Sequence, residues 1–355
     1  MTKKKDYKNI LVVRTDRIGD VVLTTPAIQA LREAFPNARI SILVTSQTRA
    51  IVDSNPYLDE VIVYDSKGKD RGFFRFWSLV FKLMKKHFDL AINYHIKNRT
   101  NALLFHACIP CRAGFENIKL GFLLNHTIPD SRIQGIKHES EYCLDILKSL
   151  GINIEKKYPL HVSIQKESEE WVEKLFLENN ILLKDKVVAV HPGASCISRR
   201  WSPKRFSQVI DQIAAKHKTK IILIGSDDNQ RIAREVIIGT STPVVDLTGK
   251  TSLSQLISLL KRCCLLISND SGPGHLAAGV GTPVVSIFSR NQPGLSATRW
   301  RSLGEKDIFF HKDVGCIQCV AHDCQKGFQC LNAVQVHEVV GAADQILNEC
   351  INSGI

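Results

Sequence analysis

The sequence has 355 residues, more than one hydrophobic core usually supports, so we expect two domains. Its composition, 44% apolar and 23% charged, is ordinary for a soluble globular protein, and the lack of any run of about 18 apolar residues excludes an integral membrane protein. A formal net charge of +12 indicates an anionic partner: nucleic acid, anionic lipid or a phosphorylated substrate. Nucleic acid is the weaker option, because no zinc-finger, helix-turn-helix or RNA-binding aromatic signature is present.

The ends of the chain and its cysteines bear on the compartment. The basic start, MTKKKDYKNI, runs directly into a strand pattern without the apolar region or cleavage site of a signal peptide. Eleven cysteines, an odd number, favour reduced thiols over a disulfide framework. We therefore expect a cytoplasmic protein.

Short apolar runs alternate with amphipathic stretches along the first half of the chain. The pattern predicts strands over 10–13, 40–44, 61–64 and 90–93, and helices over 21–35, 46–54, 73–87 and 138–150. Strands that alternate with helices form a parallel sheet. The irregular, polar residues 153–162 then place a domain boundary near Ser163.

A second series of the same kind follows. Strands are predicted over 187–190, 221–224, 244–247, 265–267 and 284–288, and helices over 167–179, 203–217, 275–280 and 334–350. The strands end in glycine, serine or histidine, which fits ligand binding at the carboxyl edge of an open parallel sheet. We expect two doubly wound α/β domains, residues 1–163 and 164–355.

The most informative stretch is residues 269–275, NDSGPGH, between a buried strand and a small-residue helix. Two glycines and a proline end the strand, and free amides at a helix start bind phosphate. We expect the amides of Ser271, Gly272 and Gly274 to bind a diphosphate, and the side chains of Asp270 and His275 to bind ribose or sugar hydroxyls. The alternative is an ordinary tight connection in an α/β domain.

Several motifs together resemble glycosyltransferase family 9, the ADP-heptose:lipopolysaccharide heptosyltransferases. They are RTDRIGD at 14–20, HPGA at 191–194, the Arg199-Arg200-Trp201 cluster, DLTGKTSL at 246–253 and NDSGPGHLAA at 269–278. The resemblance covers nearly the whole chain. It implies the GT-B fold, in which two Rossmann-like domains face each other across a cleft, the first for the acceptor and the second for the nucleotide sugar. It also implies a C-terminal helix that returns to the first domain.

The activity implied by the resemblance is inverting, metal-independent transfer of heptose from ADP-heptose to the lipopolysaccharide inner core, on a Kdo-lipid A or heptosyl acceptor. Two alternatives stay open: a nucleotide-sugar epimerase of the same fold, and a non-catalytic protein that binds an anionic glycolipid. An epimerase needs acidic pairs around one sugar and no acceptor site.

Two residues are candidates for catalysis. Asp20 matches the aspartate to which the family's general-base role is ascribed, and Gly19 before it permits close approach of the backbone. The alternative is a helix N-terminal carboxylate that interacts with the dipole. Arg199 stands where the family commonly has lysine; it can neutralise a departing diphosphate, although Arg200 or Lys204 could substitute. For these three, the alternative is a solvated basic face.

The resemblance and the strand ends together suggest binding residues. Donor contacts are expected from His191, Gly193, Arg200, Lys204, Ser226, Asp228, Thr248, Asp270, Ser271, Gly272, Gly274 and His275. Acceptor contacts are expected from Arg14, Arg17, Lys97 and Arg112. No Asp-x-Asp pair is present to hold a divalent cation, so no catalytic metal and no required cofactor are expected.

Two further stretches are unusual. Cys316, Cys319, Cys324 and Cys330 form a C-x2-C-x4-C-x5-C run in a loop over 316–330, which could hold structural zinc or an iron–sulfur cluster, or could be reduced thiols or a stress-formed disulfide.

Residues 67–87 mix seven basic residues with five aromatic ones. One stripe (Phe73, Phe76, Trp77, Val80, Phe81 and Met84) is expected to pack on the sheet, with Phe74 and Leu83 left between basic residues. This pattern suggests peripheral contact with the inner membrane; an ordinary crossover helix is the alternative.

Overall fold

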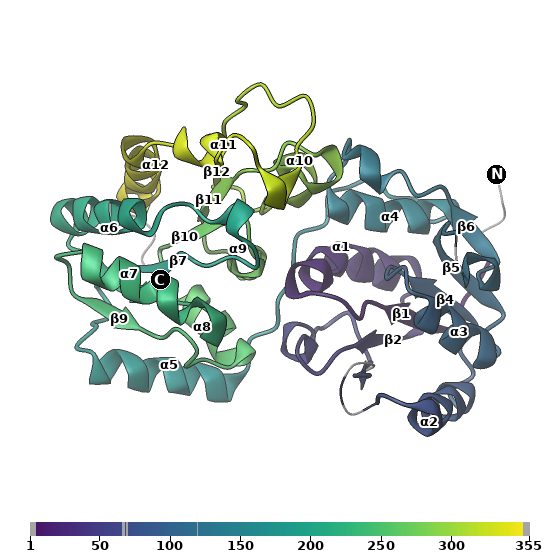
Figure 1. Ribbon diagram of the computed structural model, residues 1–355. Helices are drawn as coiled ribbons and strands as arrows, with labels where there is room; N and C mark the ends of the chain where they lie inside the picture. Colours follow the sequence, from purple (N-terminus) through teal and green to yellow (C-terminus); the bar gives the residue numbers. More distant parts are fainter. Residues whose placement is uncertain (1–4, 66–67, 69, 119, 351–355) are drawn as a thin grey trace. The chain divides into compact units, whose positions relative to one another are not determined.

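The computed structural model describes residues 5–65, 68, 70–118 and 120–350, and the chain divides into two compact units, Met1–Ser163 and Ile164–Ile355. The division falls at the boundary expected from the sequence pattern. Each unit is built around a parallel sheet of six strands with helices on its faces (Figure 1).

The sheet of the first unit has the strand order β3-β2-β1-β4-β5-β6, and every neighbouring pair is parallel. Its strands are β1 (Asn9–Val13), β2 (Arg39–Val44), β3 (Glu60–Val63), β4 (Leu90–Asn93), β5 (Cys111–Phe115) and β6 (His126–Ile128). The winding direction reverses between β1 and β4. In open sheets of this kind, ligands bind at the carboxyl ends of the two strands that flank such a reversal.

Helices cover both faces of this sheet, as a parallel sheet requires. They are α1 (Ile18–Ala34), α2 (Phe73–Met84), α3 (Asn98–His106) and α4 (Glu139–Ser149). Helices α1 and α4 pack against each other (Figure 1). Helices α2 and α3 bury apolar side chains against Leu11, Val13 and Leu43 of the strands. Both faces of β1 are therefore buried.

The second unit repeats this winding. Its sheet has the order β12-β11-β10-β7-β8-β9, again with parallel pairs only, and the direction reverses between β7 and β10. The strands are β7 (Val187–His191), β8 (Lys220–Leu223), β9 (Val244–Asp246), β10 (Leu265–Asn269), β11 (Val284–Phe288) and β12 (Ile308–His311). Both units therefore have the doubly wound order of Rossmann-like domains.

The C-terminal helix belongs to the second unit, and its expected return to the first stays a prediction. The helices of this unit are α5 (Lys166–Glu178), α6 (Pro203–His217), α7 (Gln230–Gly239), α8 (Leu253–Lys261), α9 (Gly272–Gly279), α10 (Ala297–Trp300), α11 (Gln329–Asn332) and α12 (Val336–Glu349). Helix α12 packs on α6 and lies beside β10 and β11. The reason is its apolar stripe: Val339, Ala343 and Leu347, four residues apart, are fully buried in the core of this unit.

Some predicted elements differ in extent. The helix expected over 46–54 is one 3₁₀ turn, Arg49–Ile51, and α1 begins at Ile18, earlier than expected, so that Asp20 lies in its first turn. The elements α3, β5, β6, α7, α8, α10, β12 and α11 are absent from the prediction. Several are three or four residues long or carry polar residues on exposed faces, so their apolar pattern is weak.

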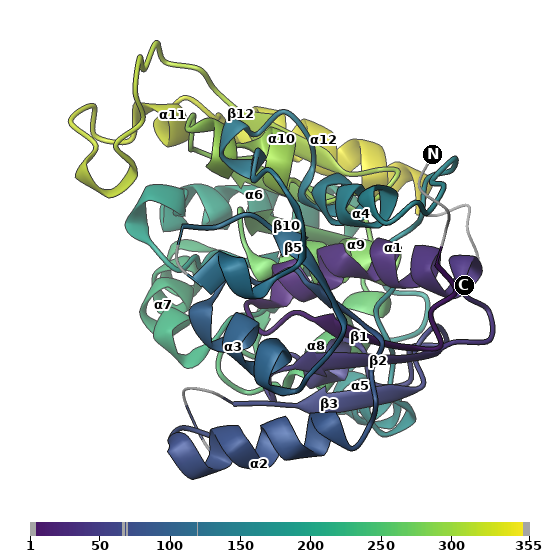
Figure 2. The same ribbon diagram turned by 90° about the vertical axis from the view of Figure 1, so that its right-hand side faces the viewer.

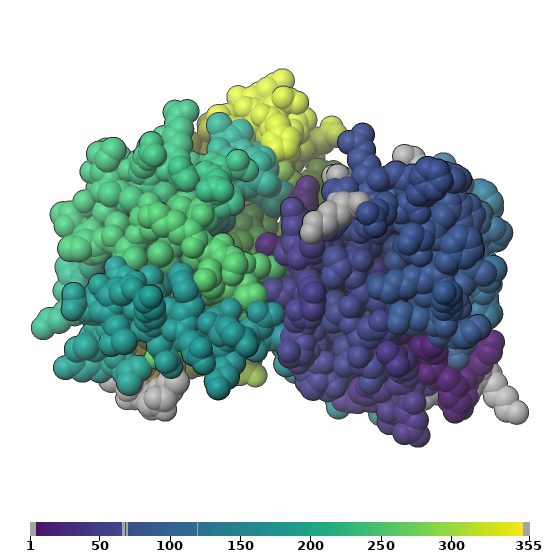
Figure 3. All heavy atoms as spheres, turned by 90° about the horizontal axis from the view of Figure 1, so that it is seen from below, coloured from purple at the N-terminus to yellow at the C-terminus, as the bar shows by residue number. Residues whose placement is uncertain are grey.

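The orientation of α2 was also wrongly predicted. Leu83, expected at the surface, is buried with Leu79 and Val80 against the sheet, whereas Phe73 and Phe81, expected in the core, are exposed. Figure 2 shows α2 alongside β3, and Figure 3 shows this part of the chain, in blue, at the surface seen from below. Lys67 and Lys69 lie outside the described residues. None of the described helices is long and apolar enough to span a bilayer.

Candidate active site

The first unit gathers charged side chains where β1 ends. Arg14 follows β1 directly, and only 1% of its surface is exposed. Its guanidinium forms ion pairs with three carboxylates: Nε lies 3.0 Å from Asp16, and Nη2 lies 2.6 Å from Asp20 and 2.9 Å from Glu139. A group so enclosed offers no face to an acceptor. Its burial therefore corrects the expected acceptor contact, and Arg14 instead holds the three acids in position.

Asp20 lies in the first turn of α1, where its side chain keeps 15% of its exposure. The carboxylate Oδ1 accepts a hydrogen bond from Arg14, and Arg17, at the N-cap of the helix, makes no side-chain capping bond. Asp20 is thus both a helix N-terminal carboxylate and a side chain at the carboxyl edge of the sheet. The two interpretations made from the sequence are compatible in this geometry, because a partly exposed oxygen can still accept a proton.

Asp16 is a second carboxylate on the same arginine. Burial raises its pKa to about 6, although the charge of Arg14 opposes this rise. Glu139, the first residue of α4, also lies 3.8 Å from Arg132, whose guanidinium is stacked 3.9 Å from the centroid of the Phe115 ring. These partners come from distant parts of the sequence, so only the fold brings them to Arg14.

His95 stands at the end of the neighbouring strand β4 and was not singled out from the sequence. Its Nδ1 lies 2.7 Å from Oγ1 of Thr15, and burial, together with the charges of Lys97 and Arg14, lowers its pKa to about 3. The ring is therefore neutral at physiological pH. A histidine two residues after a predicted strand, at the switch point, was the signal that could have found it.

The expected acceptor residues separate into two groups. Arg17 follows β1 and Lys97 follows β4, and both are exposed at the carboxyl edge. Arg112 lies near the start of β5, paired with Ala91, and its Nε donates to the carbonyl of Leu123 at 2.7 Å. Because the amino and carboxyl ends of parallel strands lie at opposite edges, Arg112 is not part of the group, which corrects that expectation.

In the second unit, polar side chains meet at the ends of β7 and β10. Nδ1 of His191 lies 2.9 Å from Oγ of Ser271, which in turn lies 2.9 Å from Oγ of Ser268. Burial lowers the pKa of His191 to about 4, so this ring too is neutral. Asn269 completes the connection, since its amide donates to the carbonyl of Pro192 at 2.8 Å. The two strands at the reversal are thus tied together by side chains.

Arg199 is held against the residue that follows β10. Its Nη1 lies 3.4 Å from Oδ2 of Asp270, and Asn269 accepts a hydrogen bond from the backbone N–H of Trp201 at 3.0 Å. Burial raises the pKa of Asp270, although Arg199 and Arg290 both oppose the rise. The structure therefore brings the arginine cluster and the NDSGPGH stretch to one place.

The residues at the ends of β8 and β9 lie beside this group. Ser226 and Asp228 are exposed after β8, and Thr248 is buried after β9. Gly193 packs so closely on Asn229 that a Cβ atom would lie 2.4 Å from its side chain. Only glycine permits that approach, so this position of the HPGA motif is set by packing.

The start of α9 offers fewer amides than the sequence suggested. The N–H of Gly274 donates to the carbonyl of Ser271 at 3.2 Å, and Pro273 has no N–H. The N–H of Gly274 is therefore used within the turn, and the expected diphosphate contacts are left to Ser271, at the N-cap of α9, and Gly272, its first residue. His275 lies further into the helix and is buried.

The other two basic candidates, Arg200 and Lys204, differ in whether their side chains are held by the protein. Lys204 is exposed in the first turn of α6, whereas Nε of Arg200 donates to the carbonyl of Ala194 at 3.0 Å. Arg200 is thus committed to the loop after β7, and Lys204 can extend toward a ligand.

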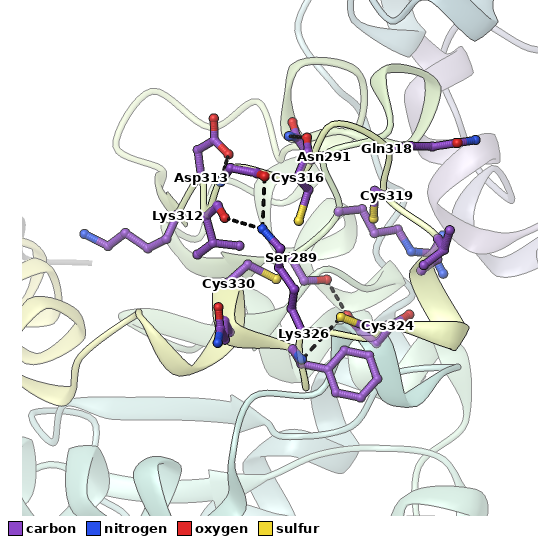
Figure 4. Close-up of a pocket in the computed structure, with 18 of the residues that line it drawn as sticks. Ser289, Asn291, Lys312, Asp313, Cys316, Gln318, Cys319, Cys324, Lys326 and Cys330 are labelled. Atoms are coloured by element: carbon purple, nitrogen blue, oxygen red, sulfur yellow. Dashed lines mark hydrogen bonds between the residues drawn. The ribbon is translucent and has the colours of Figure 1, made fainter.

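The four cysteines of the C-terminal run line one cavity of about 530 Å³, and Figure 4 shows them there. Arg290 and residues of the loop after β12 also line this cavity. They form no disulfide, and burial, together with the neighbouring thiols, raises the pKa of Cys330. Within the described residues, no three His, Cys, Asp or Glu side chains lie close enough to hold a metal ion. The four thiols thus surround a cavity, and the zinc or iron–sulfur site considered from the sequence stays a prediction.

The profile of glycosyltransferase family 9 (heptosyltransferase) matches residues 76–328, well over half of the chain. The chain belongs to glycosyltransferase family 9. It is accordingly a glycosyltransferase, and its two doubly wound units make up the GT-B fold.

Individual relatives agree with this assignment. The lipopolysaccharide heptosyltransferase 3 of Escherichia coli K12 is 28% identical over 347 residues, which cover 93% of this chain and 96% of that protein. The family 9 glycosyltransferase of Veillonella parvula is similar in structure, with a TM-score of 0.90 at 24% identity over 98% of this chain and 99% of that one. The E. coli ADP-heptose heptosyltransferase II gives a TM-score of 0.78 at 19% identity, covering 96% and 99%.

Proposed function

We propose that this protein transfers a heptose from ADP-heptose to the inner core of lipopolysaccharide, with inversion at the anomeric carbon and without a catalytic metal. The names of its relatives, which mention ADP-heptose and lipopolysaccharide, support this choice of donor and acceptor class. The observation that carries the proposal is the pair of polar groups at the two switch points: carboxylates around Arg14 in one unit, and Arg199 with the NDSGPGH residues in the other.

In the proposed step, Asp20 takes the proton of the acceptor hydroxyl while the oxygen of that hydroxyl forms a bond to the anomeric carbon. The bond from that carbon to the diphosphate breaks, its electron pair leaves with ADP, and Arg199 neutralises the charge that develops. A single displacement of this kind inverts the anomeric centre. Arg14 acts as a positioning residue, because its ion pair at 2.6 Å fixes the orientation of the Asp20 carboxylate.

The remaining residues have binding roles in this proposal. Arg17 and Lys97, both exposed cations at the edge of the first sheet, suit the phosphates and carboxylates of an inner-core acceptor. In the second unit, His191, Ser226, Asp228, Thr248 and His275 suit the nucleoside and the sugar, and Lys204 suits a phosphate. In this proposal the protein acts in the cytoplasm and draws its ADP-heptose from there.

The direct test is mass spectrometry of the product formed by purified protein from ADP-heptose and a Kdo-lipid A acceptor. A mass increase of one heptose on the acceptor, with release of ADP, supports the proposal. A donor that returns with altered stereochemistry and no change in the acceptor would instead favour the epimerase.

Transfer is expected to persist after dialysis against EDTA, within about twofold of the untreated rate. The reason is that guanidinium groups at the edge of the second sheet can take the part that Mg²⁺ plays in many phosphate-releasing enzymes. The measurement compares initial rates with EDTA and with added Mg²⁺. A rate that vanishes with EDTA and returns with Mg²⁺ would overturn metal independence.

The acceptor is a lipid, and α2 presents a surface suited to a membrane that carries it. Phe74 is 86% exposed and Phe81 is 56% exposed, with Phe73 beside them. The exposed cations Arg75 and Lys82 lie on the same helix. Aromatic side chains flanked by basic ones bind the surface of anionic bilayers. We therefore place the peripheral contact with the inner membrane on this face of α2.

Replacing both Phe74 and Phe81 by serine is expected to reduce binding to phosphatidylglycerol vesicles by at least about tenfold, since each phenylalanine buried in the interface contributes about 1.5 kcal/mol or more. Co-sedimentation measures the bound fraction. The matched control is Leu177→Ser, which removes an apolar side chain that is 78% exposed on α5. Equal binding by the wild type, the double variant and the control would remove the membrane role from α2.

A further inference from the structure

Arg290 was not singled out from the sequence, yet the fold places it at the ligand edge of the second sheet. It follows β11 by two residues, and β11 pairs with β10, the strand that leads into Asp270. Only 7% of its surface is exposed. Arg199 approaches the same place from the loop after β7, on the other side of β10. Three neighbouring strands therefore deliver two arginines and one aspartate to a single edge.

The charges at this edge do not balance. Arg199 pairs with Asp270 at 3.4 Å, and the charge of Arg290 also acts on that carboxylate. Arg290 itself donates from Nη2 to the sulfur of Cys196 at 3.1 Å. Burial opposes ionisation of that thiol, but a hydrogen bond with Ser198 and the two arginine charges lower its pKa. One buried carboxylate thus faces two guanidinium groups, which leaves a net positive site.

Both guanidinium groups also have unused donors. Among the described residues, Nε of Arg199 and Nε of Arg290 are buried and have no hydrogen-bond partner. Leaving a buried N–H unsatisfied is costly, and more so when the group is charged, so an acceptor brought by a ligand would be strongly favoured. Arg290 also lines the cavity of about 530 Å³, so a ligand there can reach it.

We propose that Arg290 and Arg199 together bind the diphosphate of the nucleotide-sugar donor, with Arg290 as a second cation for the leaving group. A planar guanidinium presents two parallel N–H donors to a phosphate, and two such groups can engage both phosphates. When the bond to the anomeric carbon breaks, its electron pair stays on a phosphate oxygen between these two charges. The inference rests on the proposed transfer reaction and names a residue that assists it.

Calorimetry with ADP, AMP and adenosine tests this role. Arg290→Gln is expected to weaken ADP binding by at least about tenfold, the size of one lost charge-assisted contact. Adenosine binding should change by less than about twofold, and AMP should lie between. Arg290→Lys keeps the charge but not the two parallel N–H donors, and its ADP affinity should lie between those of the wild type and Arg290→Gln. The matched control is Arg234→Gln, which removes an exposed arginine of α7 in the same unit.

Cys196→Ala separates phosphate binding from a purely structural contact. If Arg290 served only to hold Cys196, this variant would weaken ADP binding as much as Arg290→Gln does; the proposal requires near-native ADP affinity instead. If Arg290→Gln lowers the melting temperature of the protein without ligand, the ADP affinity of Cys196→Ala is compared with that of the conservative Arg290→Lys instead. Unchanged ADP affinity in both Arg290 variants would overturn the proposal.

The same measurements with UDP and GDP distinguish this inference from the proposed function. Binding of UDP but not ADP, still sensitive to Arg290, would overturn ADP-heptose as the donor and leave the role of Arg290 standing. If the protein binds ADP equally well with and without Arg290, the role of Arg290 is overturned and ADP-heptose stands as the proposed donor. If the wild type binds none of the three nucleotides, both proposals fail.

Discussion

Asp20→Asn is expected to reduce heptosyl transfer by about 10²–10⁴-fold, because an amide cannot take the acceptor proton and general-base catalysis contributes about that much. ADP affinity should change by less than about tenfold, since Asp20 belongs to the first unit and the expected donor residues to the second. Initial rates with saturating donor and calorimetry with ADP measure the two effects.

Asp16→Asn is the matched control for this substitution. Asp16 and Asp20 both form an ion pair with Arg14, so each variant removes one carboxylate from the same arginine. Loss of transfer in Asp20→Asn alone would assign the base to Asp20. If Asp16→Asn is the inactive variant and Asp20→Asn turns over normally, the base is Asp16, whose pKa of about 6 would also suit the role.

Arg14→Met is expected to destabilise the first unit by about 3–5 kcal/mol, because it leaves Asp16, Asp20 and Glu139 clustered without their shared cation. The expected fall in Tm is on the order of 10 °C for a domain of this size. Thermal unfolding followed by circular dichroism at pH 8 measures it. Arg17→Met, an exposed arginine three residues away, should change stability by less than about 0.5 kcal/mol.

The pH dependence gives this prediction a second readout. In Arg14→Met, the carboxylates repel one another when ionised, and protonation removes the repulsion. The folded pKa values of such acids lie above their unfolded values, so the variant binds more protons when folded and regains stability as the pH falls. The difference in Tm from the wild type should therefore be smaller at pH 5 than at pH 8. A difference that is the same at both values, or a variant as stable as the wild type, would show that the carboxylates do not depend on Arg14.

The pattern of apolar runs predicted most of the strands of both sheets, because a strand buried on two faces must be apolar nearly throughout. β1, β4, β7 and β10 lie within a residue or two of their expected positions. Short edge elements such as β6 and β12 were missed, since a strand with one neighbour needs fewer apolar residues. The face of α2 was wrongly predicted for a related reason: its apolar residues surround most of the helix, so periodicity alone did not select the buried stripe.

The sequence by itself determined the family, the doubly wound architecture, the division near Ser163 and the local motifs around Asp20, Arg199 and Asp270, because each depends on residues close together in the chain. Only the tertiary structure decided which charges are enclosed and which are free. Arg14 and Arg17 look alike in the RTDRIGD motif, yet one is buried among acids from α1 and α4 and the other is exposed. Arg290 became a candidate only when parallel pairing set β11 beside β10. Charge balance at a strand edge depends on neighbours supplied by other strands and helices, and sequence spacing does not record them.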